Sequence, residues 1–112
     1  MPTTRTYFDA YVFDTLMADL AGHDRSPAAF LVYVALWHRA RGANRVRVPA
    51  SLQELAEQTG LSKRGVQGAL QWLGRRRLIV SERAHPTAVP EYGVLRPWIR
   101  RDKGSVSNRQ RS

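Results

Sequence analysis

Residues 62–77 combine hydrogen-bond donors with positive charge and include no Asp or Glu. If the apolar residues at spacings of three and four form the buried stripe of a helix, a step of about 100° per residue turns the polar residues outward. The stripe is Val66, Ala69, Leu70 and Leu73, and the outward set is Lys63, Arg64, Gln67, Gly68, Gln71 and Arg75. Such a set binds polyanions, because its groups donate to phosphate oxygens and to base edges.

Within this stretch, the residue types predict different roles. Arg can grip two acceptors of guanine and Gln can pair with adenine, and each good pair discriminates by about 1–3 kcal/mol. We therefore predict that Arg64, Gln67 and Gln71 read bases. Ser62 caps the helix by satisfying its free N–H groups, and Ser62 and Lys63 are expected where phosphates lie.

Two glycines and a run of arginines in the same stretch need separate explanations. Gly65 and Gly68 each weaken helix propensity by roughly 1 kcal/mol relative to Ala. Either DNA approaches the backbone closely there, or the helix crosses another helix tightly. The run Arg75–Arg77 predicts a solvated helix end that neutralises the helix dipole, with phosphate contact as the most it would add.

The composition excludes several classes of function. With 112 residues, 43% hydrophobic and 24% charged, the chain has room for one ordinary domain with its own core. The absence of Cys excludes disulfides, thiolate zinc sites and thiol nucleophiles. His23, His38 and His85 have no metal-ligand spacing, and no phosphate-binding loop or nucleophile motif is present. We therefore predict a protein that is not an enzyme and has no metal or cofactor.

The positive charge is concentrated in the later part of the chain. Eighteen Lys and Arg against nine Asp and Glu give a net charge of +9. Residues 1–24 hold one Arg and four Asp, a net charge of −3, so residues 25–112 carry +12. This field attracts polyanions, with nucleic acid the first candidate and acidic lipid or an acidic protein behind it.

The N-terminal third predicts two helices. Asp9–Ala21 is amphipathic with an acidic outer face, Asp9 as a possible cap and Gly22 as its stop. Ser26–Arg41 begins with a capping Ser and with Pro27 at its first position. Residues 28–37 carry no charge, so this helix is either the central element of the fold or half of a subunit interface. No apolar stretch approaches the ~20 residues that span a bilayer, and no secretory leader is seen, so we expect a soluble cytoplasmic protein.

The rest of the chain alternates short elements. The expected order is a strand Arg45–Val48 ending at Pro49, a helix Ser51–Gln58 with a capping box, a turn Thr59–Leu61, a helix Ser62–Arg76, and strands Leu78–Val80 and Val89–Leu95 around a tip Glu82–Ala88. Trp37 and Trp72 are expected in the core, and Trp98 docks the end of a domain 1–99. A basic disordered tail, 100–112, carries Arg100, Arg101, Lys103, Arg109 and Arg111.

This order of elements, with Leu55-Ala56, Gly60-Leu61-Ser62 and Val66…Ala69-Leu70 at their spacing, resembles the winged helix-turn-helix superfamily over roughly residues 26–95. Ala56 is small where two helices cross, Gly60 can take positive φ, and Leu61 fills the angle between the helices. The resemblance implies a mainly α fold with a small β hairpin (α+β), a winged helix-turn-helix with an extra N-terminal helix. The helix 62–76 is then expected in the major groove, with the hairpin 78–95 as the flanking wing.

The hairpin supplies further candidate contacts. Arg83 and His85 at its tip, and Arg47 from the strand before the motif, could reach an adjacent minor groove. The chain departs from the superfamily at Arg77, where relatives commonly have Gly. Arg77 must therefore adopt a left-handed conformation or the helix must end differently.

These patterns together predict a sequence-specific, double-stranded DNA-binding transcriptional regulator, cytoplasmic and associated with the nucleoid. One helix covers few base pairs, so a homodimer through Asp9–Ala21 and Ser26–Arg41 is expected. If the second helix is instead the central core helix, dimerisation depends on the first alone. The alternatives are a plasmid or phage replication or partition module, a winged-helix docking subunit within a larger assembly and, more remotely, a small enzyme. A docking surface more often shows aromatic or aliphatic anchors than the donors found here.

Overall fold

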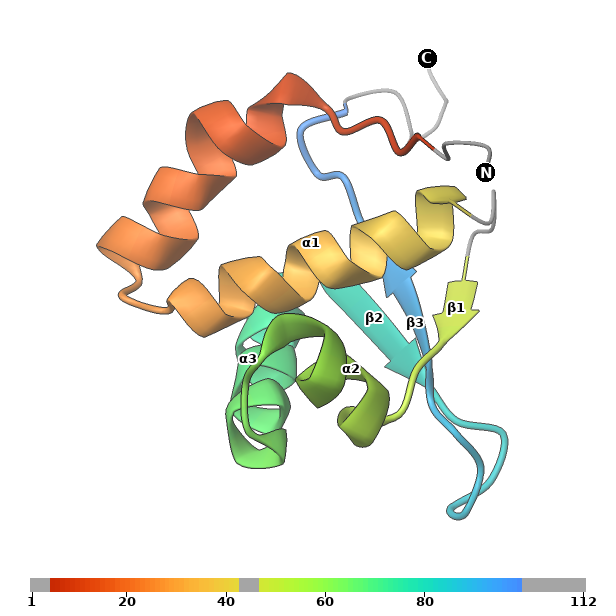
Figure 1. Ribbon diagram of the computed structural model, residues 1–112. Coiled ribbons are helices and arrows are strands. Elements are labelled where there is room, and N and C mark those ends of the chain that lie inside the picture. Colours follow the sequence, from red (N-terminus) through yellow and green to blue (C-terminus); the bar gives the residue numbers. More distant parts are fainter. Residues whose placement is uncertain (1–4, 43–46, 100–112) are drawn as a thin grey trace.

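One central helix, α1 (Pro27–Gly42), organises the structure (Figure 1). In the computed structural model, which describes residues 5–42 and 47–99, Ser26 Oγ accepts from the Ala29 N–H at 3.3 Å and Pro27 opens the helix, as predicted. Its buried side chains are Ala29, Val32, Tyr33, Ala35, Leu36, Trp37 and Ala40. Of the two roles predicted for this apolar helix, the central one is therefore confirmed.

The N-terminal helix packs along α1 and has π geometry over η1 (Val12–Leu16) and η2 (Ala18–His23). Val12, Leu16 and Leu20 are buried, so the predicted amphipathic helix is confirmed. Its predicted stop at Gly22 is wrong, because the helix continues to His23 and Arg25 then turns the chain with a φ of 54°.

The acidic face of that helix is smaller than predicted. Asp9 is not a cap, since its carboxylate accepts hydrogen bonds from Arg96 and Trp98 at 2.9 Å. Asp14 is exposed and Asp19 is half-buried, so only these two lie along the outside of the helix. The acidic face loses Asp9 because Arg96 and Trp98, which are far away in the sequence, donate hydrogen bonds to its carboxylate.

The two helices below α1 follow the predicted local rules. α2 (Leu52–Thr59) begins with a capping box, in which Ser51 and Glu54 exchange hydrogen bonds at 2.9 and 3.1 Å. Gly60 ends α2 with a φ of 81°. α3 (Lys63–Arg75) begins where Ser62 Oγ accepts from the Gly65 N–H at 2.9 Å. Its predicted stripe is buried at Val66, Ala69 and Leu73 and partly buried at Leu70.

α3 ends without a glycine. Arg77 takes the left-handed conformation, with a φ of 58°, which is one of the two expected solutions. The Arg77 N–H then donates to Gly74 O at 3.1 Å and the Leu78 N–H to Leu73 O at 2.9 Å. This pair of bonds is a Schellman motif, and the burial of Leu78 beside Leu73 accompanies it.

A three-stranded antiparallel sheet completes the fold, in the order β1-β3-β2: β1 (Arg47–Pro49), β2 (Ile79–Glu82) and β3 (Glu91–Val94). Val48, Tyr92 and Ile79 are buried beneath it. β2 starts later than predicted because the Leu78 N–H closes α3 instead of joining the ladder. The predicted residues 45 and 46 of the first strand lie outside the described part of the chain.

The C-terminal end of the described chain returns to the N-terminal helix. The Trp98 ring stacks on Tyr11, with 4.5 Å between centroids, and its Nε1 donates to Asp9. This confirms the predicted docking of Trp98. The fold is thus mainly helical with a small antiparallel sheet, in the α+β class, and none of its described helices has the length and apolarity needed to cross a membrane. The predicted tail, 100–112, lies outside the described residues.

Candidate nucleic-acid interface

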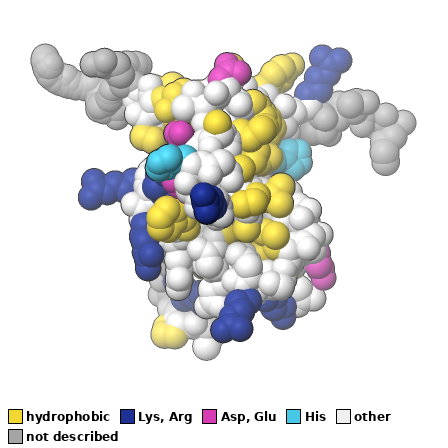
Figure 2. Space-filling view, turned by 90° about the vertical axis from the view of Figure 1, so that its left-hand side faces the viewer, with side chains coloured by type: hydrophobic (Ala, Val, Ile, Leu, Met, Phe, Trp, Pro, Cys, Tyr) yellow, Lys and Arg dark blue, Asp and Glu magenta, His cyan; other side chains and the backbone are white. Residues whose placement is uncertain are grey.

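One face of α3 presents donors to solvent. Its exposed residues are Lys63, Arg64, Gln67, Gly68, Gln71 and Arg75, and we call this set the donor face. Every member was predicted to face outward, so this orientation is confirmed. Within residues 5–42 and 47–99, none of its three cations has an ion-pair partner. Figure 2 shows Lys and Arg around the lower half of the molecule, where α2 and α3 lie in Figure 1.

Gly65 and Gly68, two of the three glycines of α3, are not explained by a helix crossing. A Cβ at Gly68 would meet no atom within 4 Å, so this position is open to solvent. A Cβ at Gly65 would lie 3.3 Å from Ser62 Oγ and 3.7 Å from Leu61 Cβ, both in the turn before the helix. Gly65 therefore makes room for the cap of its own helix. Of the two explanations offered by the sequence, only close approach by a ligand still applies to Gly68.

Two arginines counted among the possible contacts form ion pairs within the protein instead. Arg47, expected near the minor groove, forms an ion pair with Glu82, which reaches it across β3. Gly93 faces Arg47 in the ladder and has no side chain to block this path. Arg76, expected to be solvated, pairs with Asp24. The remaining cations of that run, Arg75 and Arg77, are exposed as predicted.

Asp24 has the most enclosed side chain of the ion pairs in the described part of the chain, with 4% of it exposed. It accepts from Trp72 Nε1 at 2.9 Å and from Arg76. Burial pushes the pKa of Asp24 up, but the hydrogen bonds from Trp72 and His23 and the charge of Arg76 outweigh it, so the pKa lies below 3.8. Sequence reasoning missed this pair, since the partners are far apart in the chain and neither has a local pattern.

The hairpin side chains are partly engaged with their own loop. Arg83 Nη1 donates to the carbonyl oxygens of Pro86 and Ala88 at 3.2 and 3.0 Å. His85 Nδ1 lies 3.1 Å from Thr87 Oγ1. Both residues are exposed, as expected for contacts with a ligand, but Arg83 is fixed beside the loop rather than extended from its tip.

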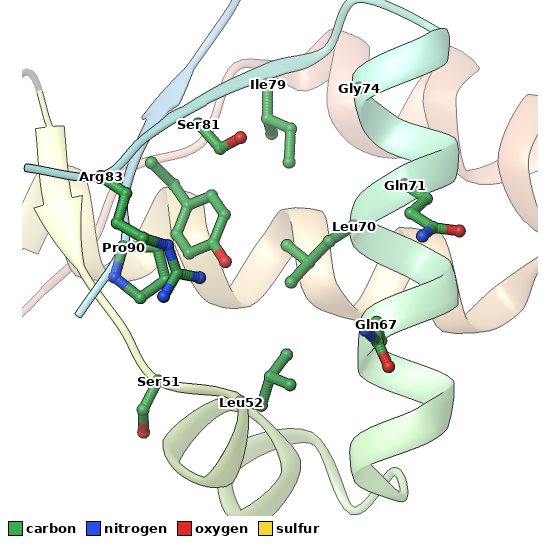
Figure 3. A pocket seen from close by; sticks show the side chains of 11 residues that line it. Ser51, Leu52, Gln67, Leu70, Gln71, Gly74, Ile79, Ser81, Arg83 and Pro90 are labelled. Atoms are coloured by element: carbon green, nitrogen blue, oxygen red, sulfur yellow. The ribbon is translucent and has the colours of Figure 1, made fainter. Parts of the chain in front are cut away.

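A groove of about 500 Å³ separates α3 from the hairpin (Figure 3). Gln67 and Gln71 line it on the α3 side, and Ser81 and Arg83 lie on the opposite side. Its other lining residues are Ser51, Leu52, Leu70, Gly74, Ile79, Pro90 and Tyr92. Sequence reasoning did not identify the groove. One local signal for it was the spacing of Ile79 and Ser81, which are two residues apart and therefore lie on the same face of a strand.

The described residues offer no arrangement for a metal ion, because no group of three His, Cys, Asp or Glu side chains converges there. The three histidines have separate neighbours: His23 lies next to Asp24, His38 bonds to Thr6, and His85 bonds to Thr87. In the comparisons with known proteins, no family model, no curated protein and no solved structure matches this chain.

Proposed function

We propose that this protein is a sequence-specific, double-stranded DNA-binding transcriptional regulator acting on the nucleoid. The observation that carries the proposal is the donor face of α3, which presents three cations and two Gln without an acidic side chain on the helix. This helix of 13 residues is about 20 Å long, and its diameter of about 10–12 Å with side chains fits the major groove, which is about 12 Å wide.

The arrangement around α3 supports a winged helix-turn-helix as the fold of this regulator. α2, the Gly60 turn and α3 form the helix-turn-helix, and the β2–β3 hairpin beside α3 corresponds to the wing. In this proposal α3 enters the major groove, with Arg64, Gln67 and Gln71 at base edges and Ser62 and Lys63 near phosphates. Close passage of DNA along the helix accounts for the open position at Gly68.

A homodimer belongs to the same proposal, because one helix of this length reads too few base pairs. Because α1 is the central core helix, the dimer would depend on the N-terminal helix, with Leu31 as the exposed large apolar side chain that α1 adds. Phe13, Met17 and Leu31 are exposed by 46%, 40% and 43%. Phe13 also packs edge to face against Phe30, with 6.0 Å between ring centroids, which joins the two helices into one apolar patch. Figure 2 shows hydrophobic side chains gathered above the basic half of this view.

The test is selection of bound duplexes from a random library by the full chain, followed by titration of Arg64→Ala. On the selected duplex, this substitution should lower affinity by about 1–3 kcal/mol and relax the base preference at one position. Lys63→Gln should instead weaken all duplexes alike and reduce the salt slope by about one unit. The absence of any complex in dilute buffer would refute the proposal. Equal losses for Arg64→Ala on selected and random DNA would refute base reading by Arg64.

A further inference from the structure

The groove beside α3 has a composition suited to a polar, negatively charged chain with apolar parts. Its floor is apolar, formed by Leu52, Leu70 and Ile79 (Figure 3). Its rim carries hydroxyl, amide and guanidinium groups, and none of its lining residues is acidic. Gln67 and Gln71 belong both to the groove and to the donor face, so a ligand on one surface continues into the other.

Tyr92 in this groove has a hydroxyl with no hydrogen-bond partner within the described part of the chain, although only 5% of the residue is exposed. Tyr33 is the contrasting case: it is fully buried, and its hydroxyl donates to Leu95 O at 2.8 Å. The Tyr92 hydroxyl is thus a donor without an acceptor of its own among the described residues. Because Tyr92 lines the groove, a ligand lying there can supply the missing acceptor.

Arg83 adds a charged donor to the same groove. Burial raises the pKa of Tyr92, and the positive charge of Arg83 offsets part of this rise. Nη1 is held by two loop carbonyls, whereas the hydrogens on Nε and Nη2 have no partner among the described residues. The guanidinium is therefore fixed in place, and its three remaining N–H groups are available to other acceptors.

The start of α2, which also borders the groove, adds little attraction for an anion. Ser51 and Glu54 already satisfy each other's backbone N–H groups in the capping box, and Glu54 carries a negative charge. An anion in the groove must therefore be held by the side chains on the hairpin side.

We propose that the groove holds the sugar–phosphate backbone of one DNA strand, and that the Tyr92 hydroxyl and the Arg83 guanidinium donate to its phosphates. The apolar floor then packs against deoxyribose, and the strand continues along the donor face. This inference rests on the proposed function and deepens it, since it assigns Tyr92 a contact that carries no sequence information. It also assigns Arg83 to the phosphate backbone of DNA, in place of the minor-groove contact predicted from the sequence.

The test is Tyr92→Phe in the full chain, titrated against the selected duplex and against random duplexes. We expect affinity to fall about five-fold on both, because one hydrogen bond is lost and the bases are unaffected. Tyr33→Phe is the matched control, since it removes a buried hydroxyl that is bonded within the protein. It should lower the free energy of unfolding and leave DNA affinity unchanged, whereas Tyr92→Phe should leave stability unchanged or raise it.

Arg83 provides a second measurement. Arg83→Gln should reduce the salt slope by about one unit, and Arg83→Lys should keep the slope while lowering affinity. Wild-type affinity and slope in Tyr92→Phe and Arg83→Gln would overturn this inference and leave the proposed function intact. A loss confined to the selected duplex would also overturn it, because Tyr92 would then be reading a base. If the wild type binds neither duplex but binds a peptide or an uncharged small molecule in the groove, both this inference and the proposed function fail.

Discussion

Arg75 and Arg76 are neighbours in the sequence, yet they belong to two different regions of the molecule. Arg75 lies on the donor face with solvent around it, whereas Arg76 holds the buried carboxylate of Asp24. A single residue on a helix changes direction by about 100°, which is enough to separate the two roles. Residue type therefore does not distinguish a cation that stabilises the fold from one that is available to a ligand.

The division between paired and unpaired cations also gives a role to the acidic N-terminal segment. The acidic N-terminal segment does more than coat one helix, because Asp9 and Asp24 turn inward to neutralise Arg96 and Arg76. The cations of α3 are left without such counter-charges among the described residues. The donor face therefore keeps its full positive charge.

The largest expected effect comes from breaking the structural pair. Asp24→Ala removes the acceptor of Trp72 and leaves Arg76 without its partner, so the free energy of unfolding should fall by about 2–3 kcal/mol. This value is below the usual range for buried pairs because Arg76 is 34% exposed. Urea unfolding measures it.

The matched controls are the two adjacent arginines. Arg76→Gln should destabilise the fold in the same direction as Asp24→Ala, while Arg75→Gln should change stability by less than about 0.5 kcal/mol. Arg75→Gln should instead weaken DNA binding, with a smaller salt slope. Equal stability losses in the two variants would abolish the distinction between the two regions.

Acid should weaken the structural pairs before it affects the donor face. For Asp9, burial raises the pKa, but bonds from Arg96 and Trp98 and nearby positive charge bring it below 3.8, as for Asp24. Both carboxylates bind fewer protons when folded, so their contribution is fully present above about pH 5. It is lost as pH falls through their lowered pKa values. Unfolding measured from pH 6 to 2 should show this decline, and Asp24→Asn should make it shallower. An equally steep decline in Asp24→Asn would contradict the assignment to Asp24.

The smallest expected effect comes from Gly68→Ala, a substitution on the donor face. Gly68→Ala should raise the free energy of unfolding by about 1 kcal/mol, because Ala is the better helix former and a Cβ there has open space. It should nevertheless weaken DNA binding, since the added methyl group would stand between the helix and the ligand. Gly22→Ala, in η2 and also in open space, is the control and should leave DNA affinity unchanged. Unchanged affinity in Gly68→Ala would show that nothing approaches the helix closely at this residue.

Much of the local structure could be predicted from the sequence. The caps at Ser26, Ser51 and Ser62 and the turn at Gly60 all formed where expected. So did the buried stripe and the donor face of α3. Each of these features depends on residues within about four positions of one another, where spacing and side-chain chemistry suffice.

Only the tertiary structure decided which charged and polar groups meet across the molecule. Asp24 and Arg76 are 52 residues apart, and Asp9 and Arg96 are 87 apart, so no local pattern could pair them. The groove likewise requires α2, α3 and both strands of the hairpin to pack before its walls face one another. The sequence by itself determined the helices, their caps and the surface that α3 presents, because these follow from backbone geometry. Packing determined which cations are neutralised, since ion pairs depend on distance in space rather than on distance along the chain.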